Sequence, residues 1–223
     1  MIRFFDILFS LSALIVLSPL FVIIFIILKL TGEGEAFYLQ QRVGKGQIKF
    51  NLYKFATMLK NSENMGSGTV TINNDPRILP LGKFLRNTKI NELPQLMNIL
   101  IGDMSIIGPR PQTQRCFDAF SEDVRKAIST IRPGLSGIGS IIFSKEESML
   151  KDIKSIEIYD EIIAPYKGSL EIWYTKNNNI MTYFILIFVT FIAIVSGSPK
   201  ALDYFFKDIP KPSEDAQNLL NIR

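Results

Sequence analysis

An unbroken apolar segment from residue 7 to residue 28 limits the folds open to this chain more than any other feature. As a straight helix, the segment is long enough to cross a hydrocarbon core of roughly 30 Å. It is too long for the apolar part of a secretory signal peptide, and no small-residue cleavage site follows Leu30. We therefore expect a helix that enters a membrane.

Ser18-Pro19 lies near the middle of this segment and favours a bent helix. Proline removes a helical N–H and its ring clashes with the preceding turn. The Ser18 hydroxyl can bond a freed carbonyl and so lower the cost of the kink in lipid. Positive residues lie on both sides, Arg3 before the segment and Lys29 after it, so the positive-inside rule gives no clear topology. A re-entrant helix satisfies both flanks, and a spanning helix is the alternative.

A second apolar run covers residues 180–195 and is marginal in length for a span. Trp173 and Tyr174 come shortly before it, and such side chains prefer the boundary between lipid and water. Lys176 and Lys200 flank the run on its two sides. The run is either a second span or a helix that lies in the interface or under the soluble domain.

Composition excludes several kinds of chemistry. The 223 residues suit one compact domain with extra segments, and they include no histidine. A Ser-His-Asp triad and a histidine-ligated zinc ion are therefore excluded. The single cysteine, Cys116, cannot form an internal disulfide and is expected to be a packing residue in a reducing compartment. The net charge of +4 does not indicate nucleic-acid binding.

The residues between the two apolar segments predict a small α+β core. Strands are expected at 37–41, 48–53 and within 135–143, the first two around a Gly-Lys-Gly turn. Apolar spacing predicts helices over 78–88, 92–100, 112–131 and 153–176, the last broken near Pro165. Residues 61–74 are expected to form a mobile loop, and the segment from residue 208 a poorly ordered end.

Residues 91–111 place carboxylates and an arginine on either side of a short apolar stretch. Glu92 and Asp103 are the carboxylates, and Arg110 lies in a Gly-Pro-Arg-Pro turn. Oxygen ligands of this kind favour Mg²⁺, with Mn²⁺ as the alternative ion. Cations near Pro or Gly turns bind phosphate oxygens well, although each could also be a surface residue paired with a nearby acid. The predicted set is Lys54, Arg77, Arg86, Arg110 and Arg132.

The chain resembles a known family, the bacterial sugar transferases that are monotopic polyprenyl-phosphate phosphoglycosyl transferases. Each matching motif is weak evidence alone, but their order along the chain is specific. They are Leu17-Ser18-Pro19, Gln41-Arg42-Val43-Gly44, Tyr53-Lys54-Phe55-Ala56-Thr57-Met58, Asn74-Asp75-Pro76-Arg77, Gly82-Lys83-Phe84-Leu85-Arg86, Glu92-Leu93-Pro94-Gln95, Gly102-Asp103-Met104-Ser105, Gly108-Pro109-Arg110-Pro111 and Arg132-Pro133-Gly134.

The resemblance implies transfer of a sugar phosphate from a UDP-sugar to a polyprenyl phosphate, usually undecaprenyl phosphate. UMP is released, Mg²⁺ is required, and the reaction begins the synthesis of a surface glycan. It also implies a re-entrant helix over residues 1–30, a domain over 31–205 on the cytoplasmic face of the inner membrane, an interfacial helix over 180–196 and a tail over 206–223. The sugar, the lipid length and a homodimeric state stay open.

The resemblance also assigns the site, with one departure. The usual Asp-Glu pair of the family falls on Asn91-Glu92, and an amide is a very poor nucleophile compared with a carboxylate. The implied metal ligands are Glu92, Asp103 and Asp75, and Lys54, Arg77, Arg86, Arg110 and Arg132 would hold the substrates. Ala56 and Gly137-Ile138-Gly139 also depart from the usual motifs, at positions expected to contact the sugar or nucleotide.

Asn91 leaves three hypotheses open. Glu92 itself is the nucleophile, or Glu92 supports direct attack by the lipid phosphate in a ternary complex. In the third hypothesis the chain is a non-catalytic membrane protein that binds a UDP-sugar or organises a glycan assembly complex. The number of retained acidic and basic motif residues favours an enzyme.

Overall fold

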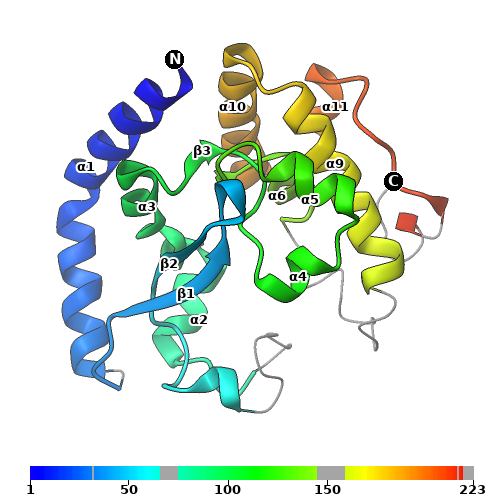
Figure 1. Ribbon diagram of the computed structural model, residues 1–223. Coiled ribbons are helices and arrows are strands. Elements are labelled where there is room, and N and C mark those ends of the chain that lie inside the picture. The colour runs from blue at the N-terminus through cyan, green and yellow to red at the C-terminus, as the bar shows by residue number, and fades with distance from the viewer. Residues whose placement is uncertain (32, 66–74, 145–158, 215, 218–223) are drawn as a thin grey trace.

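The computed structural model describes residues 1–31, 33–65, 75–144, 159–214 and 216–217. Within these residues the protein has the mixed helix and strand content of an α+β fold, as the sequence predicted (Figure 1). Helix α1 (Ile2–Thr31) runs along one side of the other elements. It is the one helix of the described part that is long and apolar enough to cross a membrane.

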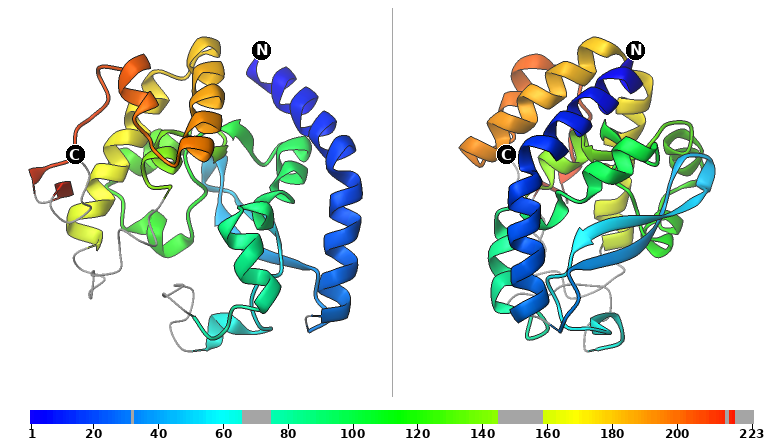
Figure 2. Two further views of the ribbon diagram at one scale, coloured as in Figure 1. Left: turned by 180° about the vertical axis from the view of Figure 1, so that it is seen from behind. Right: turned by 90° about the vertical axis from the view of Figure 1, so that its left-hand side faces the viewer.

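Helix α1 continues through Pro19 and changes direction about half-way along its length (Figure 2). Proline 19 has no N–H to donate to the carbonyl of Ile15, four residues earlier. The Ser18 hydroxyl donates to that same oxygen at 2.8 Å. The sequence-based expectation for the Ser18-Pro19 pair is confirmed, because the freed carbonyl has a local partner.

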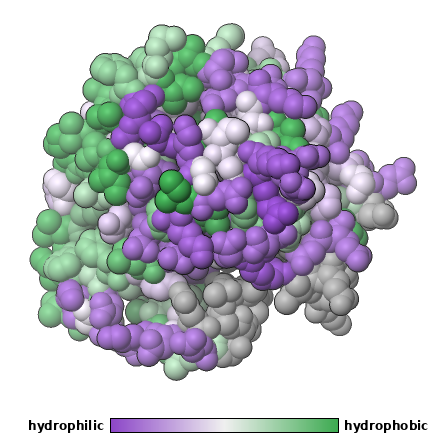
Figure 3. Space-filling view, viewed as in Figure 1, coloured by the Kyte–Doolittle hydropathy of each residue, from purple (hydrophilic) through white to green (hydrophobic). Residues whose placement is uncertain are grey.

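One face of α1 packs on the domain along the whole helix. Its first turns bond to the segment around residues 99–106 through Arg3 and Asp6. Its middle packs on Leu52 and Leu96, and its last turns, with Ile24 and Leu28, pack on Phe55 and Leu85. The opposite face is apolar and exposed, as at Ile15, Val16, Val22, Ile23 and Leu30. Hydrophobic side chains accordingly gather on the side where α1 lies (Figure 3).

Two antiparallel strands, β1 (Phe37–Val43) and β2 (Lys49–Phe55), follow α1. The predicted turn between them is present as a short 3₁₀ segment, and Gly46 adopts φ 67°, which favours glycine. The buried Asn98 side chain joins this hairpin to the next part of the chain. It accepts from the Tyr53 N–H at 2.9 Å and donates to the Asn51 carbonyl at 2.8 Å.

The remaining elements form a helical layer with one further strand pair. Strand β3 (Ser105–Ile107) pairs in parallel with β4 (Gly134–Ser136). The helices, in chain order, are η2 (Ser62–Asn64), α2 (Pro80–Asn87), η3 (Ile90–Glu92), α3 (Gln95–Ile101), α4 (Gln114–Asp118), α5 (Glu122–Ile128), α6 (Ile138–Ile142), η4 (Tyr159–Ile163), α9 (Ala164–Lys176), α10 (Ile180–Ser196) and α11 (Ala201–Phe205).

Two predicted elements differ from those observed. The helix expected over 112–131 is divided into α4 and α5, and the break lets Phe120 and Val124 enter one buried cluster. The strand expected over 135–143 ends at Ser136 and is followed by α6. The buried Ile138, Ile141 and Ile142 have helical spacing, so their burial decides the element type. The expected loop after residue 65 and the helix before residue 159 lie outside the described residues.

Helix α10 has one buried and one exposed apolar face. Tyr183, Leu186 and Val189 are fully buried in the largest core cluster, beside side chains of α9. Phe191 and Ile194 lie on the other face, with 66% and 73% of their surface exposed. The chain after α11 also contacts this cluster, because Asp208 accepts from the Trp173 indole N–H at 2.9 Å. The first residues of the segment that was expected to be poorly ordered are thus held against the core.

Candidate active site

The candidate site is centred on Glu92, the last residue of η3. Lys89 precedes the turn in a left-handed conformation with φ 59°, and this reversal turns the chain from α2 into η3. The Glu92 carboxylate meets the Arg110 guanidinium at 3.3 Å. Burial alone would raise the pKa of Glu92, but the charges of Arg110, Lys54 and Lys89 outweigh this effect and hold it below its ordinary value.

Lys54 reaches the site from β2. Burial is the main reason that the pKa of its ammonium falls to about 7, and the charges of Arg42, Arg110 and Arg86 lower it further. The Glu92 carboxylate opposes this shift. A negative charge that enters these surroundings would raise the pKa of the lysine and favour its charged form. The site therefore favours a ligand with several negative charges.

Arg42 also belongs to this site, although the sequence analysis did not select it. Burial and the nearby Arg110 charge lower its pKa to about 10. Its guanidinium donates to the Pro111 carbonyl at 3.2 Å and to the Gln40 side chain at 2.5 Å. Its Nε is buried without a hydrogen-bond partner among the described residues. The sequence feature that could have identified Arg42 is the Gln-Arg-Val-Gly motif, which lies at the end of the strand that leads into the site.

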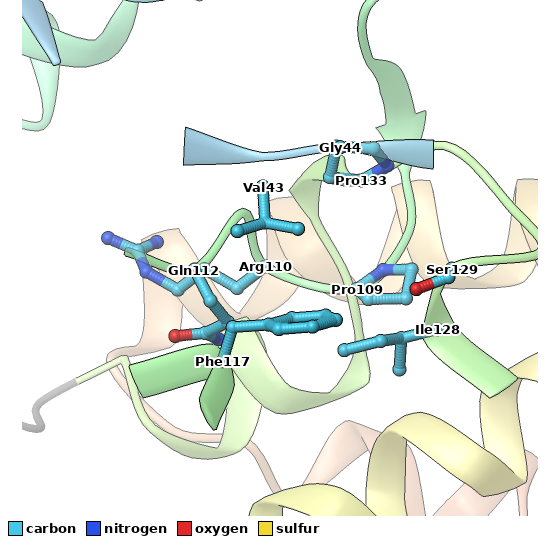
Figure 4. A pocket seen from close by; sticks show the side chains of 9 residues that line it. All are labelled: Val43, Gly44, Pro109, Arg110, Gln112, Phe117, Ile128, Ser129 and Pro133. Atoms are coloured by element: carbon cyan, nitrogen blue, oxygen red, sulfur yellow. The ribbon is translucent and has the colours of Figure 1, made fainter. Parts of the chain in front are cut away.

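Two glycine-proline motifs place Arg110. The first, Gly108-Pro109-Arg110-Pro111, follows β3, and the second, Arg132-Pro133-Gly134, leads into β4. The two contact each other, because the Gly134 N–H donates to the Pro109 carbonyl at 2.8 Å. A Cβ on Gly134 would lie 2.1 Å from the Gly108 nitrogen, so the close approach requires glycine. Figure 4 shows Arg110 in this turn, at the edge of a small pocket. The pocket is lined by Val43, Gly44, Pro109, Arg110, Gln112, Phe117, Ile128, Ser129 and Pro133.

Two of the predicted cations, Lys54 and Arg110, thus act on Glu92, and a third, Arg86, acts on Lys54. The other two have different partners. Arg77 forms a buried ion pair with Asp75 at 2.6 Å and donates to the carbonyls of Ser62 and Met65. Arg132 donates to the Gly102 carbonyl at 2.7 Å. These contacts give Arg77 and Arg132 roles in holding the backbone.

The predicted metal ligands do not form one cluster. In the described part of the chain, no three Asp, Glu, Cys or His side chains lie together as a metal site. Asp75 is paired with Arg77, and Asp103 accepts from the Asn98 amide at 3.3 Å. Glu92 alone, of the three predicted ligands, faces the cationic site. One carboxylate still suits Mg²⁺, which is often held by one or two carboxylates, waters and substrate phosphates.

Asn91 lies beside Glu92 and is 7% exposed. Its Oδ1 is buried without a hydrogen-bond partner within the residues that the structure describes. The amide is a very poor nucleophile compared with a carboxylate. Glu92, the one carboxylate of the η3 turn, is therefore the candidate nucleophile.

Comparison with known proteins agrees with these features. A family model described as bacterial sugar transferase matches residues 1–197. The chain is 33% identical over 194 residues to UDP-N-acetylgalactosamine-undecaprenyl-phosphate N-acetylgalactosaminephosphotransferase of Aeromonas hydrophila, covering 86% of this chain and 43% of that protein. It is 32% identical over 203 residues to undecaprenyl-phosphate galactose phosphotransferase of Salmonella typhimurium, covering 84% and 39%.

A third relative is shorter. Over 108 residues the chain is 43% identical to exopolysaccharide production protein PSS of Rhizobium leguminosarum bv. phaseoli. The matched region covers 48% of this chain and 54% of that protein. The chain thus spans less than half of the Aeromonas and Salmonella relatives and about half of the Rhizobium one.

Proposed function

Because this chain belongs to the bacterial sugar transferase family, we propose that it transfers a sugar phosphate from a UDP-sugar to a polyprenyl phosphate. The lipid is undecaprenyl phosphate, the acceptor in the names of the Aeromonas and Salmonella relatives. The products are UMP and a polyprenyl-diphosphate sugar, which begins a surface glycan. The observation that carries the proposal is the Glu92 carboxylate paired with Arg110 and set beside Lys54.

The cations bind and orient the diphosphate of the UDP-sugar. Arg110 and Arg42 offer forked donors that match phosphate oxygens, and Lys54 offers a point charge. Their charge stabilises the negative charge that develops as the phosphoryl group is transferred. Mg²⁺, held by Glu92 and phosphate oxygens, would neutralise further charge.

Glu92 is the residue that we assign to the transfer step. Its low pKa keeps it ionised at neutral pH, as a nucleophile requires. In a double displacement, a Glu92 oxygen attacks the sugar-linked phosphorus and the bond to UMP breaks. An oxygen of the polyprenyl phosphate then attacks the same phosphorus and releases Glu92. In the alternative, the lipid phosphate attacks directly while Glu92 helps to hold the diphosphate, and the kinetics are sequential.

The packing of α1 supports a re-entrant arrangement in the membrane. A helix that crossed the bilayer would carry its first turns away from the domain that holds its last turns. Here Arg3 and Asp6, at one end, and Leu28, at the other, contact the same domain. We therefore assign a re-entrant helix, with the exposed face of α10 in the membrane interface. The site then lies at the cytoplasmic face, where a soluble nucleotide sugar and a lipid phosphate can meet.

Asn91 motivates one other candidate function. Without the family's usual aspartate, the chain could bind a UDP-sugar as a non-catalytic component of a glycan assembly complex. Under this alternative Glu92→Gln would leave the cellular role intact, and Asn91→Asp would create transfer activity.

UMP release distinguishes the two functions. The purified protein in lipid nanodiscs would be given a panel of UDP-sugars, Mg²⁺ and undecaprenyl phosphate. We expect UMP release that EDTA abolishes and that Glu92→Gln lowers by about a hundredfold or more. Glu122→Gln is the matched control, because the Glu122 side chain is 71% exposed and is paired with Lys126 on its own helix. Release of no UMP with any sugar, or equal release by Glu92→Gln, would contradict the assignment.

A further inference from the structure

Two arginines from distant parts of the chain meet at the end of α3. Arg3, in the first turn of α1, donates to the Ile99 carbonyl at 2.5 Å and to the Leu100 carbonyl at 2.8 Å. The Arg132 Nε donates to the Gly102 carbonyl at 2.7 Å. A Cβ on Gly102 would lie 3.4 Å from the Arg3 Nη2, so both guanidinium groups lie against this one glycine.

The two positive charges are not balanced by acids. Within the described residues, neither arginine forms an ion pair. Two acids that are close in sequence have other partners: the Asp6 Oδ1 accepts three hydrogen bonds, and the Asp103 Oδ2 accepts from the Asn98 amide. The end of a helix offers about half an elementary negative charge. The turn after α3 therefore keeps a net positive charge.

Each guanidinium also keeps N–H donors for a ligand. In the described part of the chain, Arg3 uses two hydrogen bonds and Arg132 uses one, and all three go to carbonyls at the end of α3. A guanidinium carries more donors than these bonds need. Both side chains are only partly buried, so a ligand can reach them. Forked donors of this kind match the oxygens of a phosphate group.

Exposed apolar side chains lie next to these cations. Met1 and Phe4, within two residues of Arg3, are 90% and 65% exposed, and Ile101, in the turn itself, is 60% exposed. Helix α1 is also long and apolar enough to enter a membrane. At a bilayer surface, apolar side chains lie among the acyl chains and neighbouring cations reach the headgroup phosphates. This combination suits the headgroup of a lipid better than a soluble anion.

We propose that Arg3 and Arg132 together bind the phosphate of an acidic bilayer phospholipid, such as phosphatidylglycerol. The lipid joins the start of α1 to the segment before β4 and is not the acceptor substrate. Glu92, the residue assigned to the transfer step, pairs with Arg110 instead. The inference rests on the proposed re-entrant helix, which brings Arg3 to the cytoplasmic surface of the membrane, and it requires no transfer activity.

Melting temperatures in nanodiscs of two compositions test this site. The full-length protein would be placed in phosphatidylcholine alone and in an equal mixture of phosphatidylcholine and phosphatidylglycerol. We expect the mixture to raise the melting temperature of wild type by about 3 °C or more and to leave that of Arg3→Gln/Arg132→Gln unchanged. Each protein is compared with itself, so stability lost with the bonds to α3 does not affect the result.

Two further variants complete the comparison. Lys45→Gln/Lys126→Gln removes the same charge from exposed side chains of the hairpin turn and α5, and it should keep the wild-type shift. Arg132→Gln alone removes one bond to α3 and should show less than half of the shift. It carries the test if the double variant does not fold.

Three results would overturn the proposal. An equal shift in Arg3→Gln/Arg132→Gln would show that phosphatidylglycerol acts elsewhere. The full shift with inorganic phosphate in phosphatidylcholine nanodiscs would show a site for any phosphate. A shift with farnesyl phosphate and none with phosphatidylglycerol would assign the two arginines to the acceptor lipid. The expected shifts in a protein that releases no UMP would support the lipid site and contradict only the proposed transfer.

Discussion

At the scale of single residues, the site is a group of charges that do not balance. Glu92 brings one negative charge to a place where Lys54, Arg42 and Arg110 bring positive ones. The mismatch is visible in Lys54, whose pKa of about 7 reflects burial first and neighbouring cations second. A diphosphate supplies the missing negative charge, so the ligand is part of the charge balance of the site.

This imbalance predicts a pH dependence of UDP-sugar binding. Below about pH 7 the Lys54 ammonium is charged and attracts the diphosphate, and above this pH the free protein has lost the proton. Affinity should therefore fall as the pH rises from 6 to 8, a range in which the diphosphate itself does not titrate. Calorimetry of wild type and Lys54→Met would test this. An equal pH slope for both proteins would contradict it.

The lowered pKa of Lys54 affects the stability of the unliganded fold in the opposite direction to ligand affinity: stability rises with pH, whereas affinity falls. The unfolded chain binds this proton up to about pH 10.5, whereas the folded chain loses it near pH 7. Between these values the unfolded state holds more protons, so the contribution of Lys54 to stability rises with pH. In the absence of a ligand, the charged form of Lys54 is therefore disfavoured first by burial and second by the neighbouring cations.

At the scale of elements, polar side chains fix the first turns of α1. The Asp6 carboxylate accepts from the Ser105 hydroxyl, the Ile106 N–H and the Tyr183 hydroxyl, each at 2.9 Å. These donors belong to β3 and α10, so one side chain joins three elements. An acid is tolerated in this long apolar helix because it is buried in the domain and its Oδ1 accepts three hydrogen bonds.

We expect Asp6→Ala to lower the free energy of unfolding by roughly 2–4 kcal/mol, because three buried donors lose their acceptor. Thermal unfolding in a mild detergent would measure the loss. Asp123→Ala is the control, since Asp123 is exposed at the start of α5 and should change stability little. A melting temperature for Asp6→Ala equal to that of the control would show that these bonds contribute little.

At the scale of the whole molecule, two apolar surfaces belong to helices far apart in the sequence. The exposed face of α1 and the outer face of α10 both carry large apolar side chains. The first turns of these helices are joined through Asp6 and Tyr183 and through Phe5 and Phe184, whose rings meet edge to face at 4.9 Å. The proposed membrane-facing surface is thus a property of the folded chain.

Cysteine labelling tests the re-entrant arrangement of α1. In a Cys116→Ser background, Phe4→Cys and Leu30→Cys would place single thiols at positions that are 65% and 80% exposed. We expect a membrane-impermeant maleimide to reach both from the cytoplasmic side, in inside-out vesicles. Labelling of Phe4→Cys only from the opposite side would establish a spanning helix.

The sequence by itself determined the features that depend on near neighbours. An apolar run with Ser18-Pro19 at its centre specifies a bent helix, because the freed Ile15 carbonyl and the hydroxyl that bonds it are three residues apart. The hairpin turn and the glycine-proline motifs around Arg110 follow from local backbone chemistry. The ordered motifs were also sufficient to indicate the family, and the family is confirmed.

Only the tertiary structure decided which charged side chains meet. Arg77, Arg110 and Arg132 have similar local sequences beside proline, yet Arg110 alone of the three pairs with Glu92. Arg42 gained its place at the site in the same way. Partners that are 18 residues apart, as for Glu92 and Arg110, or 177 apart, as for Asp6 and Tyr183, are set by packing of whole elements. Local sequence patterns do not specify which of these distant residues will meet, because charge and burial at a site depend on every element that surrounds it.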